Sequence, residues 1–171
     1  ELKEYYKQTS ESDTTKISFY EDTYSLYNLY RFAHYYEEAY GKYIWLKSGA
    51  SLVIEHTEAM TVIDVNTGSV LKKKKQEDTL FYQINREAAK EIARQLRLRN
   101  ISGIIMIDFI NMKDTAQKEK LLSLLDSECK KDRVHCNVID MTALNLVEMT
   151  RSKVRKPLHE QIRSCMKNNR S

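Results

Sequence analysis

The chain has 171 residues and a net charge of +4, and 42% of its residues are hydrophobic and 30% charged. This length and composition are typical of one full domain, or of one domain with part of another, and they argue against global disorder. The mild positive charge permits a nucleic acid or another anionic partner without requiring one. No run approaches the roughly 18 to 20 apolar residues that span a bilayer, so we predict no membrane contact. The three cysteines are widely spaced and odd in number, which favours the reducing cytoplasm.

The residues before position 48 are predicted to form a small N-terminal piece. About the first 15 residues are polar and are expected to be flexible. Two helical stretches follow, at about residues 24–30 and 31–40, and Gly41 ends the second. Residues 42–47 (KYIWLK) then indicate a strand, followed by a turn. We place a domain boundary here, which gives domains over residues 1–47 and 48–171.

The second domain begins with two short apolar runs, Leu52–Ile54 and Met60–Ile63, on either side of a polar turn. This pattern predicts a β-hairpin or two neighbouring strands. The longest helix is predicted over about residues 78–99, because apolar residues recur there at every fourth position. Gly103–Asp108 is typical of a buried strand. Strand, helix and strand therefore form a βαβ unit, with a right-handed crossover.

The rest of the chain alternates helices and strands. We predict a helix over Asp114–Lys131, strands over Val134–Ile139 and Leu146–Thr150, and a basic helix that starts at Pro157. The expected fold class is α/β, with a mixed β-sheet and flanking helices.

Two of these strands end in an acid. Asp64 ends the second apolar run, Asn66 follows on the same face of the strand, and Asp108 ends the later strand. Carboxylates at strand ends, with an amide beside one of them, suit a hard cation such as Mg²⁺. Such an ion activates water and neutralises phosphate charge, as phosphodiester hydrolysis requires. For each acid alone, a turn or a helix cap is the more common explanation; the two acids together, with Asn66 on the same face, leave both interpretations open.

Several basic residues are candidates for contacts with RNA phosphates. They are Lys72, Lys73, Lys74, Lys75, Arg97 and Arg99. The lysine run directly follows the first acid and the amide, which favours phosphate contacts, but four successive lysines are also typical of a solvated loop. The two arginines lie near the end of the long helix, where they complement the helix dipole or, alternatively, reach RNA.

Four segments together resemble the RNase E/G family of endoribonucleases. They are TEAMTVIDVNTG (Thr57–Gly68), INREAAKEIARQLRLRNISGIIMIDFINM (Ile84–Met112), KKDR (Lys130–Arg133) and LVEMTRSKVRKPL (Leu146–Leu158). Their order and spacing match the family over residues 45–165, and the combination is far more specific than one short motif.

The resemblance implies a DNase I-like catalytic subdomain, preceded by the end of an RNase H-like subdomain. It implies that Asp64 and Asp108 coordinate a catalytic Mg²⁺, and that Asn66 contacts the scissile phosphate or holds the site. The implied reaction is hydrolysis of single-stranded RNA to 5′-phosphate and 3′-hydroxyl ends, in RNA processing and decay. A homodimer through the catalytic subdomain is the implied assembly.

The sequence departs from the family pattern at three points. The family's oligonucleotide-binding barrel and 5′-end sensor are not in these residues, which also begin without methionine, so we expect a fragment or a reduced form. Asn111 stands where many members have aspartate. Cys165 lacks the second cysteine of the family's CxxC zinc link, so we predict no zinc. An inactive RNA-binding or assembly module therefore remains the alternative to an active nuclease.

Overall fold

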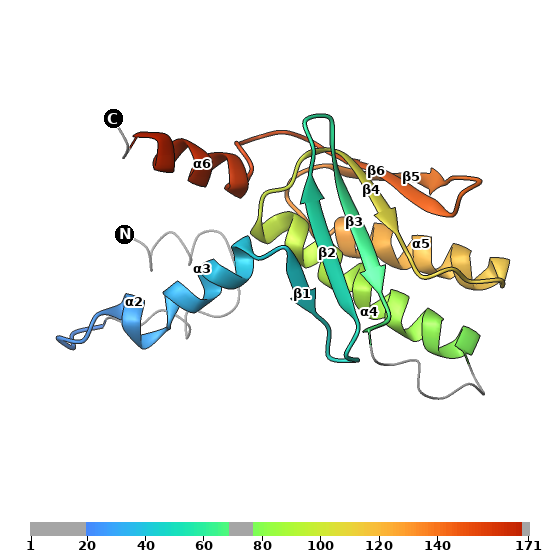
Figure 1. The fold of residues 1–171 in the computed structure, drawn as a ribbon, viewed down its shortest axis with the longest axis horizontal. Helices are drawn as coiled ribbons and strands as arrows, with labels where there is room; N and C mark the ends of the chain where they lie inside the picture. Colours follow the sequence, from blue (N-terminus) through green and yellow to red (C-terminus); the bar gives the residue numbers. More distant parts are fainter. Residues whose placement is uncertain (1–19, 69–76, 169–171) are drawn as a thin grey trace, which may run out of the picture. The chain divides into compact units, whose positions relative to one another are not determined.

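Figure 1 shows the computed structural model of the chain, which describes residues 20–68 and 77–168. The chain divides into two compact units, residues 1–35 and 36–171. In the first unit, helix α2 (Leu26–Leu29) buries none of its residues. Arg31 has a positive φ of 49° and separates α2 from α3 (Phe32–Tyr40), which continues into the second unit.

The second unit is built on a six-stranded sheet in the order β1-β2-β3-β4-β6-β5. Its strands are β1 (Tyr43–Trp45), β2 (Ser51–His56), β3 (Met60–Asn66), β4 (Gly103–Asp108), β5 (Cys136–Met141) and β6 (Leu146–Arg151). β3 and β4 run parallel, and the other neighbouring strands run antiparallel. The sheet is therefore mixed, and the predicted α/β fold class is confirmed.

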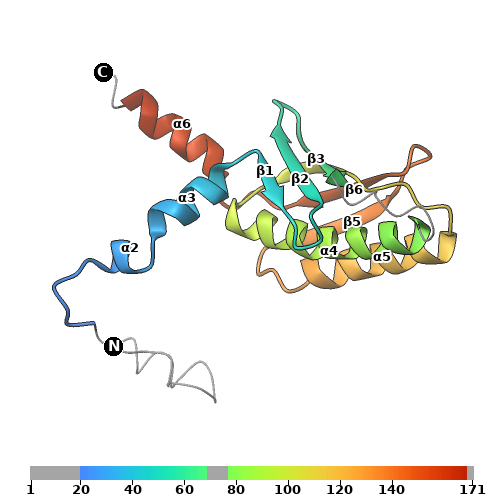
Figure 2. The same ribbon diagram turned by 60° about the horizontal axis from the view of Figure 1, so that its bottom comes forward.

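Two helices pack side by side against one face of this sheet, as Figure 2 shows. α4 (Glu77–Leu98) carries the predicted apolar stripe, and α5 (Thr115–Cys129) begins where the Asp114 side chain accepts a hydrogen bond from the Ala116 amide. The stripe of α4 is buried in the core: Ile84, Ala88, Ile92 and Leu96 are each at most 1% exposed. α4 connects parallel β3 to β4, so the predicted βαβ unit is confirmed. A last helix, α6 (Leu158–Asn168), follows the sheet.

The alternation of side chains along each strand gives the sheet two different faces. In β3, Thr61, Ile63 and Val65 are buried, while Asp64 and Asn66 point to the other face. This other face, called the open face below, carries partly exposed side chains from several strands. The candidate site therefore lies across the sheet from α4 and α5.

The predicted domain boundary falls between β1 and β2, which pair with each other. The strand assigned to the N-terminal piece is thus part of the same sheet as the candidate site. The division into an RNase H-like piece and a DNase I-like subdomain stays a prediction.

Candidate metal centre

The two strand-end acids are neighbours in the sheet. Asp64 of β3 is in register with Asp108 of β4, and because the strands are parallel both side chains stand at the same edge and on the same face. Adjacent strands are about 4.8 Å apart, so one ion can contact both carboxylates. Asn66 lies beside them, and its Nδ2 donates a hydrogen bond of 2.6 Å to Oδ2 of Asp64. The structure thus brings together the three residues that the sequence analysis selected.

The surroundings of Asp108 change the acidity of its carboxyl group. Partial burial, followed by the negative charge of Asp64, raises the pKa of Asp108 above its ordinary value. A divalent cation between the two acids would relieve this repulsion. One or two carboxylates are the usual protein ligands of Mg²⁺, which keeps several waters, so these residues fit a magnesium ion. In the described part of the chain, no three or more histidine, cysteine, aspartate or glutamate side chains gather into a metal-binding group.

A shallow hollow of about 710 Å³ extends from the acids over the open face. It is lined by Met60, Val62, Asp64, Ile104, Met106, Asp108, Leu146 and Glu148. The floor is thus mostly apolar, with carboxylates around it. Such a surface offers contact area to a substrate beside the acids.

Glu148 belongs to this surface, although the sequence analysis did not include it in the site. It lies opposite Met106 in the antiparallel pair of β6 with β4. The available signal was the alternation of β6, in which Val147 and Met149 are buried and Glu148 therefore points to the open face. The sequence alone did not reveal that β6 pairs with β4, so this signal could not be connected to the acids.

A buried amide on α4 holds the backbone directly after Asp108. The side chain of Asn85 is fully buried. Its Nδ2 donates to the Ile110 carbonyl at 2.7 Å, and its Oδ1 accepts from the Ile110 amide at 3.0 Å. The exit of β4 is therefore fixed to the neighbouring helix by two hydrogen bonds.

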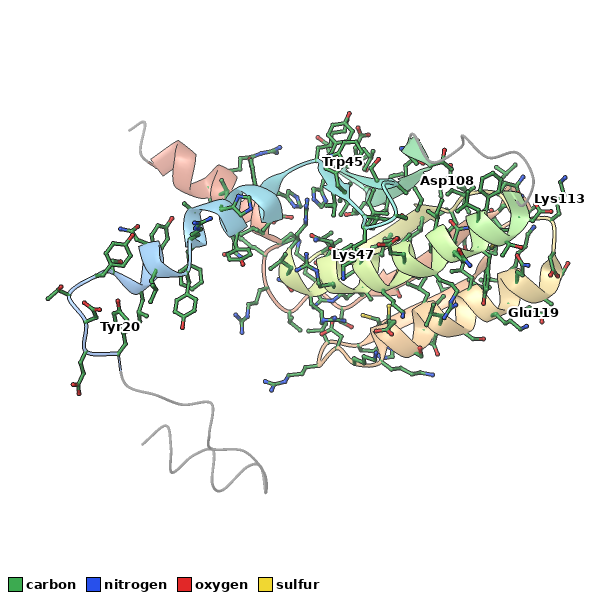
Figure 3. The ribbon with its side chains drawn as sticks, turned by 90° about the horizontal axis from the view of Figure 1, so that it is seen from below. Tyr20, Trp45, Lys47, Asp108, Lys113 and Glu119 are labelled. Atoms are coloured by element: carbon green, nitrogen blue, oxygen red, sulfur yellow. The ribbon has the colours of Figure 1, made fainter. Side chains whose placement is uncertain are left out.

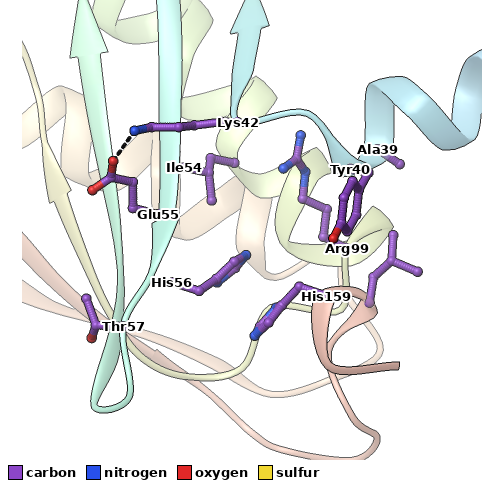
Figure 4. A pocket seen from close by; sticks show the side chains of 10 residues that line it. Ala39, Tyr40, Lys42, Ile54, Glu55, His56, Thr57, Arg99 and His159 are labelled. Atoms are coloured by element: carbon purple, nitrogen blue, oxygen red, sulfur yellow. Dashed lines mark ion pairs between the residues drawn. The ribbon is translucent and has the colours of Figure 1, made fainter. Parts of the chain in front are cut away.

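The two arginine candidates have different surroundings. Arg99 is only 5% exposed and donates hydrogen bonds to Oε1 of Gln95 and to the Gly41 carbonyl, both at 2.7 Å. Figure 4 shows Arg99 among the side chains around a separate hollow. Arg97 is exposed, and its Nη1 donates to the Glu128 carbonyl at 3.4 Å. The Arg97 side chain is therefore open to solvent, whereas the Arg99 guanidinium is held inside the protein, and contact of either residue with RNA stays a prediction.

Other sequence predictions are not tested by the structure. Lys72, Lys73, Lys74 and Lys75 lie outside the described residues. Cys165 belongs to α6, but its side chain is also outside the described part, so the absence of zinc stays a prediction. No helix in the described ranges combines the length and the apolar character that crossing a membrane requires.

Comparison with known proteins gives the same assignment as the motifs. The model of the "Ribonuclease E/G family" matches residues 1–154. Ribonuclease G of Escherichia coli is 41% identical over 85% of this chain, and Ribonuclease G of Haemophilus influenzae is 40% identical over 92%. Ribonuclease E of a Nostoc species is 35% identical over 93%. The chain spans 29%, 32% and 23% of the lengths of these three proteins. The chain therefore belongs to the ribonuclease E/G family.

Proposed function

We propose that the chain is the catalytic subdomain of an endoribonuclease, which hydrolyses single-stranded RNA to 5′-phosphate and 3′-hydroxyl ends. The observation that carries this proposal is the in-register pair Asp64 and Asp108 at the ends of parallel strands, inside the region that matches the family. The relatives are named as ribonucleases, which supports an RNA substrate. RNA processing and decay in the cytoplasm, and a homodimer through this subdomain, are part of the same proposal.

Asp64 and Asp108 would hold the Mg²⁺ of this enzyme. When bound, the ion supplies positive charge to the phosphate and activates water for attack. Asn66 fixes one oxygen of Asp64 by its hydrogen bond, which leaves the second oxygen for a ligand. Asn85 keeps the strand end that carries Asp108 in place. The chain's own contribution is therefore to keep two carboxylates close together despite their repulsion.

Two measurements on the same variants test the proposal. We expect Mg²⁺ to shift the amide NMR signals of β3 and β4, and Asp64→Asn or Asp108→Asn to abolish that shift. We also expect cleavage of a fluorogenic single-stranded RNA with Mg²⁺ but not with EDTA, and a loss of about 100-fold or more in either variant. Glu119→Gln removes one exposed charge on α5 and is the matched control.

The outcomes separate the two interpretations of the family resemblance. Equal cleavage by all variants, with and without Mg²⁺, would contradict the assignment of the two acids. Mg²⁺ binding that depends on both acids, without cleavage of any RNA, would indicate the inactive binding or assembly module. An absence of both Mg²⁺ binding and RNA cleavage would contradict the proposed metal centre.

A further inference from the structure

Two large aromatic side chains of β1 are exposed close to the candidate metal centre. Tyr43 is 59% exposed and Trp45 is 73% exposed, whereas Ile44 between them is 4% exposed. Because side chains alternate along a strand, both aromatic residues belong to the open face. Figure 3 shows Trp45 and Asp108 on the side of the sheet away from the two long helices.

The strand register places these aromatic residues in line with the site. Tyr43 is in register with Val53, which is in register with Asp64. Trp45 is likewise connected through Ser51 to Asn66. Each aromatic residue is therefore two strands from the centre, or roughly 10 Å. A chain of a few nucleotides reaches from one to the other.

Basic side chains lie next to Trp45 around the β1 edge of the sheet. They line a hollow of about 400 Å³ between β1 and α4, on the helix side of that edge. The hollow is lined by Ile44, Trp45, Leu46, Lys47, Glu87, Lys90, Glu91, Arg94 and Arg97. Four of these residues are cations and two are acids, and the cations include Arg97, one of the two arginines predicted to contact RNA.

Both acids of this hollow already have partners within the protein. Glu87 accepts hydrogen bonds from the backbone amides of Lys47 and Ser48, at 2.7 and 3.2 Å. Glu91 forms an ion pair with Arg94 at 3.0 Å. Lys47 and Lys90 are exposed, so the hollow presents net positive charge to a ligand. Phosphate groups match this charge.

We propose that Tyr43, Trp45 and this basic hollow form a stacking site for unpaired nucleobases, which holds single-stranded RNA beside the candidate metal centre. Every base has an apolar face that stacks on an aromatic ring, and a neighbouring positive groove follows the phosphates. Duplex RNA keeps its bases stacked on one another and does not offer these faces. The identity of the ligand as RNA rests on the proposed function, but the test of this site measures RNA binding without cleavage.

Fluorescence gives a direct readout, because Trp45 is the chain's single tryptophan. The chain is titrated in EDTA with a short single-stranded oligoribonucleotide, with an abasic oligomer of equal length and charge, and with an RNA duplex. We expect quenching of Trp45 by the single strand and at least about tenfold weaker binding of the other two. Equal quenching by the abasic oligomer overturns the proposal. The proposal is also overturned if the emission of Trp45 changes with protein concentration but not with RNA. That result would show that a second copy of the chain covers the aromatic residues.

Variants test the same site through the anisotropy of a labelled RNA. We expect Tyr43→Ala and Trp45→Ala to weaken binding by about tenfold each, and Trp45→Phe to keep most of it. Leu144→Ala is the matched control, because Leu144 is 78% exposed and lies in the turn between β5 and β6. Circular dichroism confirms that each variant is folded. Unchanged binding by folded Trp45→Ala overturns the proposal, as does an absence of RNA binding by the unmodified chain.

Two readouts separate this proposal from the proposed catalytic function. Quenching of Trp45 by RNA in EDTA reports the stacking site, whereas Mg²⁺ binding and cleavage report the two acids. If Trp45 quenching persists while the two acids prove irrelevant to Mg²⁺ and cleavage, the stacking site stands and the proposed function fails. If Mg²⁺ binding and cleavage depend on the acids but the fluorescence of Trp45 does not respond to RNA, the proposed function stands and the stacking site fails.

Discussion

Asn85 shows how a neutral, buried residue can determine the position of a charged one. It exchanges two hydrogen bonds with the backbone of Ile110, two residues after Asp108. A buried amide that loses such partners costs free energy, because the backbone groups it served cannot reach water. The carboxylate of Asp108 is therefore positioned by α4 as well as by β3.

The Asn85→Ala variant is expected to be less stable by about 1 to 3 kcal/mol, because it leaves the amide and carbonyl of Ile110 without their partner. It should also weaken Mg²⁺ binding at Asp108. Urea unfolding and Mg²⁺ titration measure the two effects. Gln83→Ala, an exposed position on the same helix, is the control. Unchanged stability and Mg²⁺ affinity in Asn85→Ala would refute this role.

Single residues were predictable from the sequence where a local rule determines their position. The period of two along a strand placed Asn66 beside Asp64, and the hydrogen bond between them confirms that placement. Arg99 follows no such rule. Its burial depends on Gln95 one turn earlier and on a carbonyl at Gly41, 58 residues away in the sequence. Contacts of this range are set by the packing of the whole unit.

At the scale of elements, the residues that follow β3 pack closely against the turn between β1 and β2. Gly68 has a positive φ of 57°, which favours glycine. A Cβ atom added at Gly68 would lie 2.7 Å from the carbonyl oxygen of Gly49, which is backbone and cannot rotate away. The two turns pack closely, and Asn66 is only two residues before the contact.

Gly68→Ala is expected to destabilise the fold by more than the roughly 1 kcal/mol that a left-handed alanine costs, because the clash with Gly49 adds to it. Gly103→Ala isolates the conformational cost, since Gly103 has a φ of 88° but no atom within 4 Å of the added Cβ. Thermal or urea unfolding of both variants gives the difference. The steric explanation fails if the two variants are equally stable.

The βαβ unit was predictable because its strands are apolar runs and its helix has a clear period of four. The start of β5 was not. The sequence predicted a strand from Val134, but the structure begins it at Cys136. The carboxylate of Asp132 accepts a hydrogen bond from the Val134 amide at 2.9 Å and keeps that residue in a turn. The hydrophobic pattern of a sequence cannot predict a side chain that binds a backbone amide in place of the strand ladder.

At the scale of the whole molecule, one buried ion pair connects distant parts of the second unit. Asp132, in the turn after α5, bonds Nε of Arg151 on β6 at 2.9 Å, and the two side chains are 7% and 3% exposed. Nη1 of Arg151 also donates to Oδ1 of Asn100 and to the Ile101 carbonyl, both at 2.9 Å. The pair therefore holds the turn, the sheet and the entry to β4 together.

This ion pair predicts a specific loss of stability in acid. Burial raises the pKa of Asp132, but hydrogen bonds from Arg151 and from the Val134 amide outweigh it, so the pKa lies below its ordinary value of 3.8. The folded state then binds fewer protons than the unfolded state. The ion pair's contribution to stability is complete above pH 3.8 and disappears as the pH falls through the lowered pKa of Asp132.

We expect Asp132→Asn to lose about 3 kcal/mol at pH 7, because it leaves a buried arginine without its charge partner. Its unfolding free energy should also fall less steeply below pH 4 than that of the unmodified chain. Urea unfolding across the acid range measures both effects. Asp126→Asn, which removes an exposed ion pair with Lys130, should change stability by less than about 1 kcal/mol. Similar losses in the two variants would contradict the special role of the buried pair.

A second connection joins α6 to the β2–β3 hairpin through two histidines. The rings of His56 and His159 are stacked, with centroids 3.8 Å apart and planes 15° apart, and they face each other in Figure 4. His56 Nδ1 also lies 3.0 Å from Oγ1 of Thr61. Burial, followed by the charges of His159 and Arg99, lowers the pKa of His56 to about 4, against the opposing attraction of Glu160.

The pKa of His56 predicts how stability changes with pH. The folded state holds this ring neutral down to about pH 4, while the unfolded chain protonates it near 6.5. The unfolded state therefore binds more protons between these values, and stability should rise with pH across that window and level off above it. His56→Gln should flatten this rise, whereas His135→Gln, at an exposed position, should not. Urea unfolding at several pH values from 4 to 8 measures the slope. An unchanged slope in His56→Gln would show that the stacked pair does not couple protonation to folding.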